Sequence, residues 1–218
     1  MLDRFLRYVQ VDTQAAEGAD AFPSTAKQLD LSRMLARELR EIGLEDVRLD
    51  DHGYVYATVP GTPGAPVVGV LAHVDTSPES PGGGVVPILH EAYPGGAIVL
   101  PGDPTQVLDP HDLPALAGRI GHDIVTSDGT TLLGADDKAG VAEIMAAAAY
   151  LHRTREAGEP RATVRIGFTV DEEVGRGVEQ FSLEEFGADV AYTLDGSGTG
   201  EIEDETFSAK QGTVTIRG

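Results

Sequence analysis

The chain has 218 residues, of which 41% are hydrophobic and 24% charged, and it contains no cysteine. This length and composition are typical of one folded globular domain. Acidic residues outnumber basic ones by 36 to 16, and the net charge of -20 disfavours binding to nucleic acid or to an anionic membrane. The lack of cysteine excludes disulfides, thiolate nucleophiles and cysteine-ligated metals, so any metal site must use His, Asp or Glu.

The sequence shows no recognisable targeting or membrane-spanning segment. Its first residues lack the apolar core of a signal peptide, and no stretch approaches the ~20 apolar residues that cross a bilayer. We therefore expect a soluble, cytoplasmic protein.

The N-terminal part combines helix and strand patterns. Apolar residues at helical spacing predict a short helix near residues 2–9. A second helix is expected after Pro23, because Thr25 and Gln28 fit a capping box and Gly43 is well placed to end the helix. Strand-like runs follow at residues 47–49, 54–59 and 67–71. The last of these runs is continuously apolar, which is typical of a strand buried on both faces.

The rest of the chain continues the alternation after a long interruption. Residues 77–115 are dense in proline and glycine and predict an irregular excursion with short strands. A helix is expected from Asp136 toward Leu151, with alanines that allow close packing. The remaining expected elements are strands at 164–170, 190–194 and 213–216 and a short helix at 183–186. The alternation predicts an α/β fold with a mixed, partly parallel sheet.

Polar residues follow the predicted strands at the edge where α/β sheets bind ligands. His73 and Asp75 come after one strand. The triplet 171–173, Asp-Glu-Glu, comes after a second strand, and Asp195 after a third. Asp136 opens a helix, where backbone N–H groups and the helix dipole favour a carboxylate. Four segments far apart in sequence therefore place polar groups at one edge.

Each segment alone has an ordinary structural explanation. His73 and Asp75 could belong to an exposed strand end, Asp136 could be an N-cap, and the acidic triplet could be a solvated turn. Together they suggest a metal site, because a carboxylate beside a ligating imidazole fixes its tautomer and adjacent carboxylates repel one another without a cation. No Ser-His-Asp order or phosphate-binding glycine loop is present. The chemistry would therefore fall to a metal ion, and zinc, which acidifies bound water and polarises a carbonyl, suits amide hydrolysis.

Four motifs carry these residues: HVDTSP at 73–78, LLGADDKAG at 132–140, DEEVGRG at 171–177 and AYTLDG at 191–196. These motifs resemble those of the peptidase T family of dizinc tripeptide aminopeptidases. The similarity also covers shorter segments at 11–14, 22–25 and 93–96. This family is related to carboxypeptidase G and the succinyl-diaminopimelate desuccinylases. The resemblance implies a cytoplasmic enzyme that removes the N-terminal residue of a tripeptide.

The resemblance also implies a role for each site residue. The implied ligands of two Zn²⁺ ions are His73 and Asp195 for the first, Glu173 for the second and Asp136 as the bridge between them. Asp75 would orient His73. Glu172 would be the general base that takes a proton from the attacking water.

The resemblance further implies that residues 1–218 are the N-terminal portion of a three-layer zinc-peptidase catalytic domain. Members of the family continue into a dimerisation lid and a return segment with a last zinc-binding histidine, and no histidine follows His152 here. We therefore expect one zinc ion to be held better than two, no dimer contacts through the lid, and little or no peptidase activity from this chain alone.

Two other interpretations stay open. The same motifs are shared with related dizinc dipeptidases and N-acyl amino acid hydrolases, which would act on a different substrate. The carboxylates could instead belong to a non-catalytic acidic fragment that at most binds a metal. In either enzyme interpretation the partner is a small peptide-like substrate, with no nucleic acid and no membrane.

Overall fold

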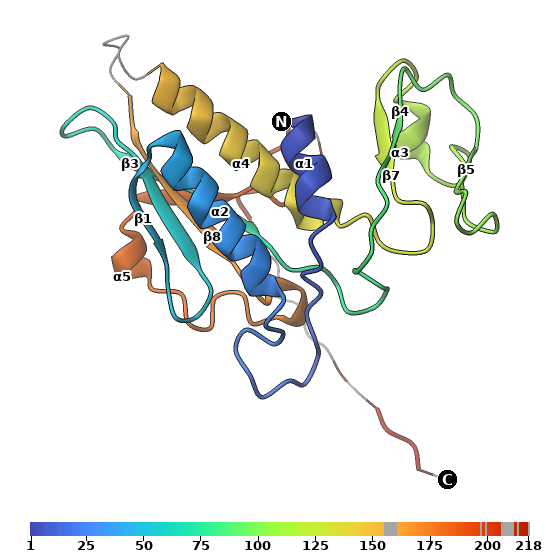
Figure 1. The fold of residues 1–218 in the computed structure, drawn as a ribbon, viewed down its shortest axis with the longest axis horizontal. Helices are drawn as coiled ribbons and strands as arrows, with labels where there is room; N and C mark the ends of the chain where they lie inside the picture. The colour runs from blue at the N-terminus through green and yellow to red at the C-terminus, as the bar shows by residue number, and fades with distance from the viewer. Residues whose placement is uncertain (155–160, 197, 199, 206–211, 213, 218) are drawn as a thin grey trace.

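A computed structural model describes residues 1–154, 161–196, 198, 200–205, 212 and 214–217 (Figure 1). Its elements are α1 (Leu2–Val9), α2 (Gln28–Ile42), β1 (Glu45–Leu49), β2 (Val55–Val59), β3 (Val67–His73), β4 (Ile88–His90), β5 (Ile98–Val99), β6 (Val107–Leu108), α3 (Pro114–Ala117), β7 (Ile124–Thr126), α4 (Ala135–Arg153), β8 (Thr163–Thr169), the 3-10 turn η2 (Glu172–Val174), α5 (Leu183–Phe186) and β9 (Val190–Thr193). No described helix is long and apolar enough to span a membrane.

The main sheet has five strands in the order β1-β2-β8-β3-β9. β2 is antiparallel to both β1 and β8, whereas β3 is parallel to β8 on one side and to β9 on the other. The prediction of a mixed, partly parallel sheet is confirmed. Because β8, β3 and β9 run in the same direction, their carboxyl ends meet at one edge of the sheet.

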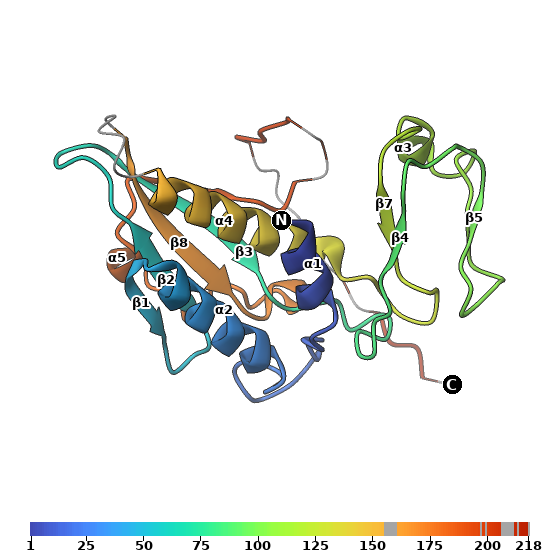
Figure 2. The ribbon, with the colours of Figure 1, turned by 45° about the horizontal axis from the view of Figure 1, so that its top comes forward.

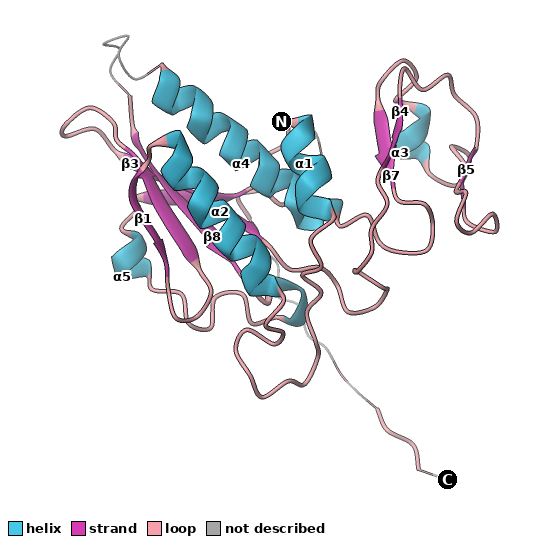
Figure 3. Ribbon diagram, in the orientation of Figure 1, coloured by secondary structure: helices cyan, strands magenta, loops and turns pink. Residues whose placement is uncertain are grey.

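Helices α2 and α4 lie side by side on one face of the sheet, and α1 packs against α4 (Figures 1, 2 and 3). Most apolar residues that recur at helical spacing in α2 and α4 fill the core between helix and sheet: Leu31, Leu35, Leu39, Val141, Ile144, Met145 and Ala148 are buried, whereas Ile42 and Leu151 are half-buried. On the opposite face, Phe186 of α5 joins an aromatic group with Tyr54, Tyr56 and Phe181. Aromatic side chains therefore cover part of this second face.

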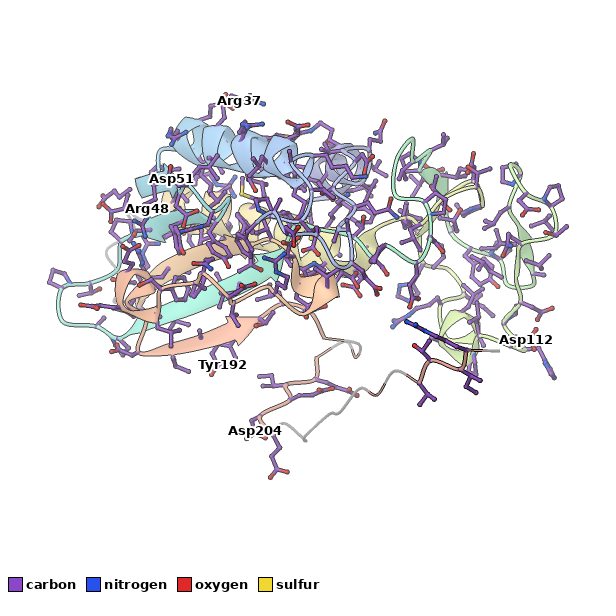
Figure 4. All side chains as sticks on the ribbon, turned by 90° about the horizontal axis from the view of Figure 1, so that it is seen from below. Arg37, Arg48, Asp51, Asp112, Tyr192 and Asp204 are labelled. Carbon is purple, nitrogen blue, oxygen red and sulfur yellow. The ribbon has the colours of Figure 1, made fainter. Side chains whose placement is uncertain are left out.

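β9 is an edge strand, and it contributes little to the core. All four of its residues are exposed, and the side chain of Tyr192 points away from the sheet (Figure 4). The strand nevertheless keeps its register through parallel pairing with β3, from Val68 opposite Val190 to Leu71 opposite Thr193. That pairing fixes where the chain leaves the sheet just before Asp195.

The chain between β3 and α4 forms a small body that stands apart from the sheet (Figures 1 and 2). It contains the antiparallel pairs β4–β7 and β5–β6 and the single turn α3. Tyr93, Ile98 and Leu100 form its own buried apolar cluster. The predicted excursion with short strands is confirmed, but it extends well past residue 115.

Three details differ from the sequence-based expectations. Thr25 does not cap α2, because its hydroxyl donates to the Gln14 carbonyl oxygen and the helix begins only at Gln28. His73 is the last residue of β3 rather than a residue beyond the strand. Of the strand expected at 213–216, residue 213 lies outside the described residues and 214–216 form no strand.

Gly140 allows α4 to lie unusually close to Leu194, the residue that follows β9. A Cβ at this position would lie 2.2 Å from the carbonyl oxygen of Leu194 and 2.4 Å from Oδ1 of Asp137. Both distances are below any van der Waals contact, and the first involves backbone that cannot rotate away. The absence of a side chain at Gly140 therefore sets the distance between α4 and the residue that precedes Asp195.

The substitution Gly140→Ala should destabilise the fold by about 1–3 kcal/mol, the usual range for overpacking a tight interior. Gly118→Ala is the matched control, because its Cβ would meet nothing closer than the Ala115 carbonyl oxygen at 3.8 Å. Urea unfolding of both variants measures the difference. Equal unfolding midpoints for the two variants would contradict this account of the α4 packing.

Candidate metal centre

The imidazole of His73 is the point on which the site converges. The side chain is 1% exposed at the end of β3, and its Nε2 atom faces carboxylates from three other segments. Nε2 lies 2.9 Å from Oδ1 of Asp136, 3.8 Å from Oδ2 of Asp195 and 3.8 Å from Oε2 of Glu172. The structure thus brings together residues from the ends of β3, β8 and β9 and from the start of α4.

Asp75 holds the other side of the same ring. It is completely buried, and both its backbone carbonyl oxygen and its Oδ1 atom lie near Nδ1 of His73, at 3.1 and 3.4 Å. Its carboxylate also accepts the backbone N–H groups of Glu172 and Glu173, each at 3.1 Å. One buried carboxylate therefore orients His73 and fixes the turn that carries both glutamates.

Two aspartates joined by a cis peptide bond, Asp136 and Asp137, lie at the start of α4, and their side chains have different roles. Asp137 is buried, and its carboxylate accepts the backbone N–H groups of Gly140 at 3.2 Å and of His73 at 3.1 Å. Asp137 therefore caps the helix and ties it to β3. This leaves Asp136, whose side chain is 70% exposed, to face His73. Sequence reasoning missed Asp137, although an Asp three residues before a helical N–H is a common capping signal.

Glu173 lies to one side of this convergence. The carboxylate lines a cavity of about 330 Å³ together with Ser77, Leu132, Leu133, Gly134, Ala135 and Asp136. Asp136 is therefore common to the cavity and to the group around His73. The cavity combines two acidic side chains with an apolar wall.

The concentration of carboxylates shifts the pKa of several groups. Burial alone would lower the pKa of His73, but the hydrogen bond to Asp75 and the charges of Asp75, Asp137 and Asp195 outweigh it and raise the pKa to about 10. Burial, reinforced by the charge of Asp195, raises the pKa of Asp137 to about 8. Burial and neighbouring carboxylates also raise the pKa values of Glu172 and Asp195.

The donor set fits a divalent cation. His73, Asp136 and Asp195 each offer one ligand atom, and these three atoms lie within 4.8 Å of one another. One imidazole nitrogen and carboxylate oxygens are ligands that Zn²⁺ accepts. A cation placed among them would offset the mutual repulsion of the carboxylates. The described residues can therefore hold a metal ion at this point.

Known proteins with similar sequences are peptidases. A family model described as M42 glutamyl aminopeptidase matches residues 124–216. Peptidase T from Geobacillus kaustophilus is 49% identical over 220 aligned residues, which cover all of this chain and 53% of the relative. The chain therefore spans about half the length of the curated relatives it matches.

Solved structures show the same similarity in three dimensions. A tripeptidase from Staphylococcus aureus superimposes with a TM-score of 0.61 and 25% identity, covering 90% of this chain and 43% of the other. Aminopeptidase PepT from Bacillus cereus gives a TM-score of 0.61 and 26% identity with the same coverage. In sequence over its whole length, and in fold over nine tenths of it, this chain resembles peptidase T.

Proposed function

We propose that this chain carries the metal centre of a zinc-dependent aminopeptidase that releases the N-terminal residue of tripeptides. The proposal is carried by one observation: the carboxylates of Asp136 and Asp195 lie close to Nε2 of His73, and Glu172 lies beside them. The similarity to peptidase T and to a solved tripeptidase supports the substrate class. The matching aminopeptidase model favours a substrate with a free amine over an N-acylated one.

The proposed ligands of the first zinc ion are His73, Asp136 and Asp195. Asp136 would also bridge to a second ion held by Glu173, because both side chains line the same cavity. The chemistry that zinc supplies when bound is polarisation of the scissile carbonyl and acidification of a water molecule. Asp75 would keep His73 in the tautomer that leaves Nε2 free, since it occupies the Nδ1 side of the ring.

Glu172 is the proposed general base. Its backbone is fixed by Asp75, whereas its side chain is 52% exposed and reaches within 3.8 Å of Nε2 of His73. Burial and the surrounding carboxylates raise its pKa above the ordinary value of a glutamate, which makes the carboxylate a stronger base. Glu172 would take the proton of the attacking water and pass it to the leaving amine.

The cavity beside Asp136 and Glu173 is the proposed position of the first substrate residue. Its acidic side would attract the free amine of the peptide, and Leu132 and Leu133 would contact the side chain. A pocket with an apolar wall and a few polar groups is typical of small-molecule sites.

Hydrolysis of a tripeptide tests the reaction. The zinc-loaded chain should release the N-terminal residue from a free tripeptide far more slowly than full-length peptidase T from Geobacillus kaustophilus, the positive control, and should release none from the N-acetylated form. Glu172→Gln should lower the rate by about 10²–10⁴-fold, the usual contribution of a general base. Glu184→Gln, on the exposed helix α5, is the matched control. Equal cleavage of both peptides would contradict the aminopeptidase assignment.

Calorimetric titration with zinc tests the ligands. His73→Ala should weaken binding by at least about 100-fold, because the remaining donors are carboxylates alone. His111→Ala is the control, since this imidazole is 92% exposed in the separate small body. If His73→Ala binds zinc as tightly as His111→Ala, the metal centre lies elsewhere.

The metal-free chain should lose stability as the pH rises. The pKa is raised from 3.8 to about 8 for Asp137, from 4.5 to about 7 for Glu173 and from 6.5 to about 10 for His73. Between each pair of values the folded chain binds more protons than the unfolded chain. Stability therefore falls between about pH 4 and pH 10.

Thermal unfolding across this pH range, with and without zinc, measures the effect. Zinc should restore most of the lost stability near pH 8, because the ion replaces the missing protons. A metal-free melting temperature that rises from pH 5 to pH 9 would show that the charge balance of the centre is misassigned.

A further inference from the structure

Asp171 is a buried carboxylate that immediately precedes Glu172 and Glu173. It is not exposed to solvent at all, and it is not one of the donors that converge on His73. Its Oδ2 atom accepts the backbone N–H of Ser24 at 2.6 Å. Its Oδ1 atom accepts the Ser24 hydroxyl at 2.5 Å and Nε2 of Gln28 at 2.6 Å. Gln28 closes the ring by accepting the backbone N–H of Asp171 at 3.0 Å.

The backbone of Asp171 adopts a conformation that this network has to hold. Its φ of 59° and ψ of 27° lie in the left-handed region, which residues other than glycine seldom occupy. This residue turns the chain from the end of β8 into η2. The direction of the Glu172 and Glu173 side chains therefore depends on the conformation of Asp171.

The turn is held from two sides by two different carboxylates. From the β3 side, Asp75 accepts the N–H groups of Glu172 and Glu173. From the α2 side, Asp171 is held by Ser24 and Gln28. The hydroxyl of Ser24 also accepts the backbone N–H of Ala16, next to the segment that pairs with Thr76. Both supports are thus linked through the chain around residues 14–16.

We propose that Asp171, together with Ser24 and Gln28, is the positioning residue for the general base and the second metal ligand. It keeps the turn 172–174 in the one conformation that presents Glu172 to the attacking water and Glu173 to the cavity. This role rests on the proposed function of the two glutamates, but the geometric claim about the turn can be tested apart from it.

Replacing Asp171 with asparagine should break this network even though the shape of the side chain is kept. If the new amide nitrogen takes the position of Oδ2, its N–H₂ group faces the backbone N–H of Ser24. If it takes the position of Oδ1, the N–H₂ group faces Nε2 of Gln28, and the oxygen of Gln28 already accepts the backbone N–H of residue 171. In either orientation two donors face each other, so a buried donor loses its acceptor.

The experiment compares Asp171→Asn with Glu38→Gln in the whole 218-residue chain. Glu38 is a matched control, because it is also a largely buried carboxylate with several partners, Arg4, Arg7 and Tyr8, but it joins α1 to α2 away from the centre. Hydrogen exchange of individual amides is measured by NMR, and kcat and KM are measured on a tripeptide with zinc.

In Asp171→Asn we expect the amides of Glu172 and Glu173 to exchange at least about tenfold faster while those of β8 stay protected. We also expect kcat to fall by about 10²-fold, as for a misplaced catalytic group, with a smaller rise in KM because Glu173 lines the proposed substrate cavity. Glu38→Gln should leave kcat and the two amides unchanged. If Asp171→Asn does not fold, Ser24→Ala decides, because it removes one donor and keeps the backbone N–H; it should give a smaller change in the same two amides.

Unchanged exchange at residues 172 and 173 in folded variants, or a uniform increase in all amides, would overturn the positioning role. Failure of the unmodified chain to bind zinc would instead contradict the proposed function. In that case the exchange data still decide whether Asp171 holds the turn.

Discussion

The candidate metal centre depends on the buried carboxylate of Asp75. A fully buried carboxylate is tolerated only when its oxygens receive hydrogen bonds or face a charge, and here two backbone N–H groups of the 172–174 turn donate to it while Nδ1 of His73 lies 3.4 Å away. The parallel pairing of β3 with β8, which sets His73 opposite Thr169, brings these groups to the same place. The register of β3 against β8 therefore determines the geometry of the site.

The centre also concentrates charge in a way that opposes folding. Several acidic side chains gather around one imidazole, and four of them, Asp137, Glu172, Glu173 and Asp195, are more easily protonated than an ordinary carboxylate. If the edge of the sheet around His73 contributed only to stability, apolar residues would be expected there instead of carboxylates. Shifted titration of this kind, caused by burial and by specific neighbours, is characteristic of functional sites rather than of ordinary acidic surface.

Much of the fold could be predicted because its elements have clear local patterns. Helix 183–186 was placed correctly, and the buried strands and α4 were found within a few residues. The strands of the small body could not be placed, because two or three residues carry too little periodicity. The spacing of Thr25 and Gln28 predicted a helix cap, but the Thr25 hydroxyl instead donates a hydrogen bond to the carbonyl oxygen of Gln14 in another part of the chain.

The residues of the candidate site were easier to find than the residues that support them. His73, Asp136 and Asp195 stand at ends of elements, which the sequence makes visible. Asp171 was seen only as one of three acidic residues, because its partner Ser24 lies 147 residues away. Contacts of that range leave no periodic trace in a single sequence.

The small body between β3 and α4 has a further consequence. Its buried cluster of Tyr93, Ile98 and Leu100 shares no described residue with the main core. Its surface can therefore diverge among homologues without disturbing the sheet, while its two connections lead directly to Thr76 and Gly134 beside the metal centre. The sequence of this small body and that of the sheet edge with the candidate metal centre can therefore change largely separately.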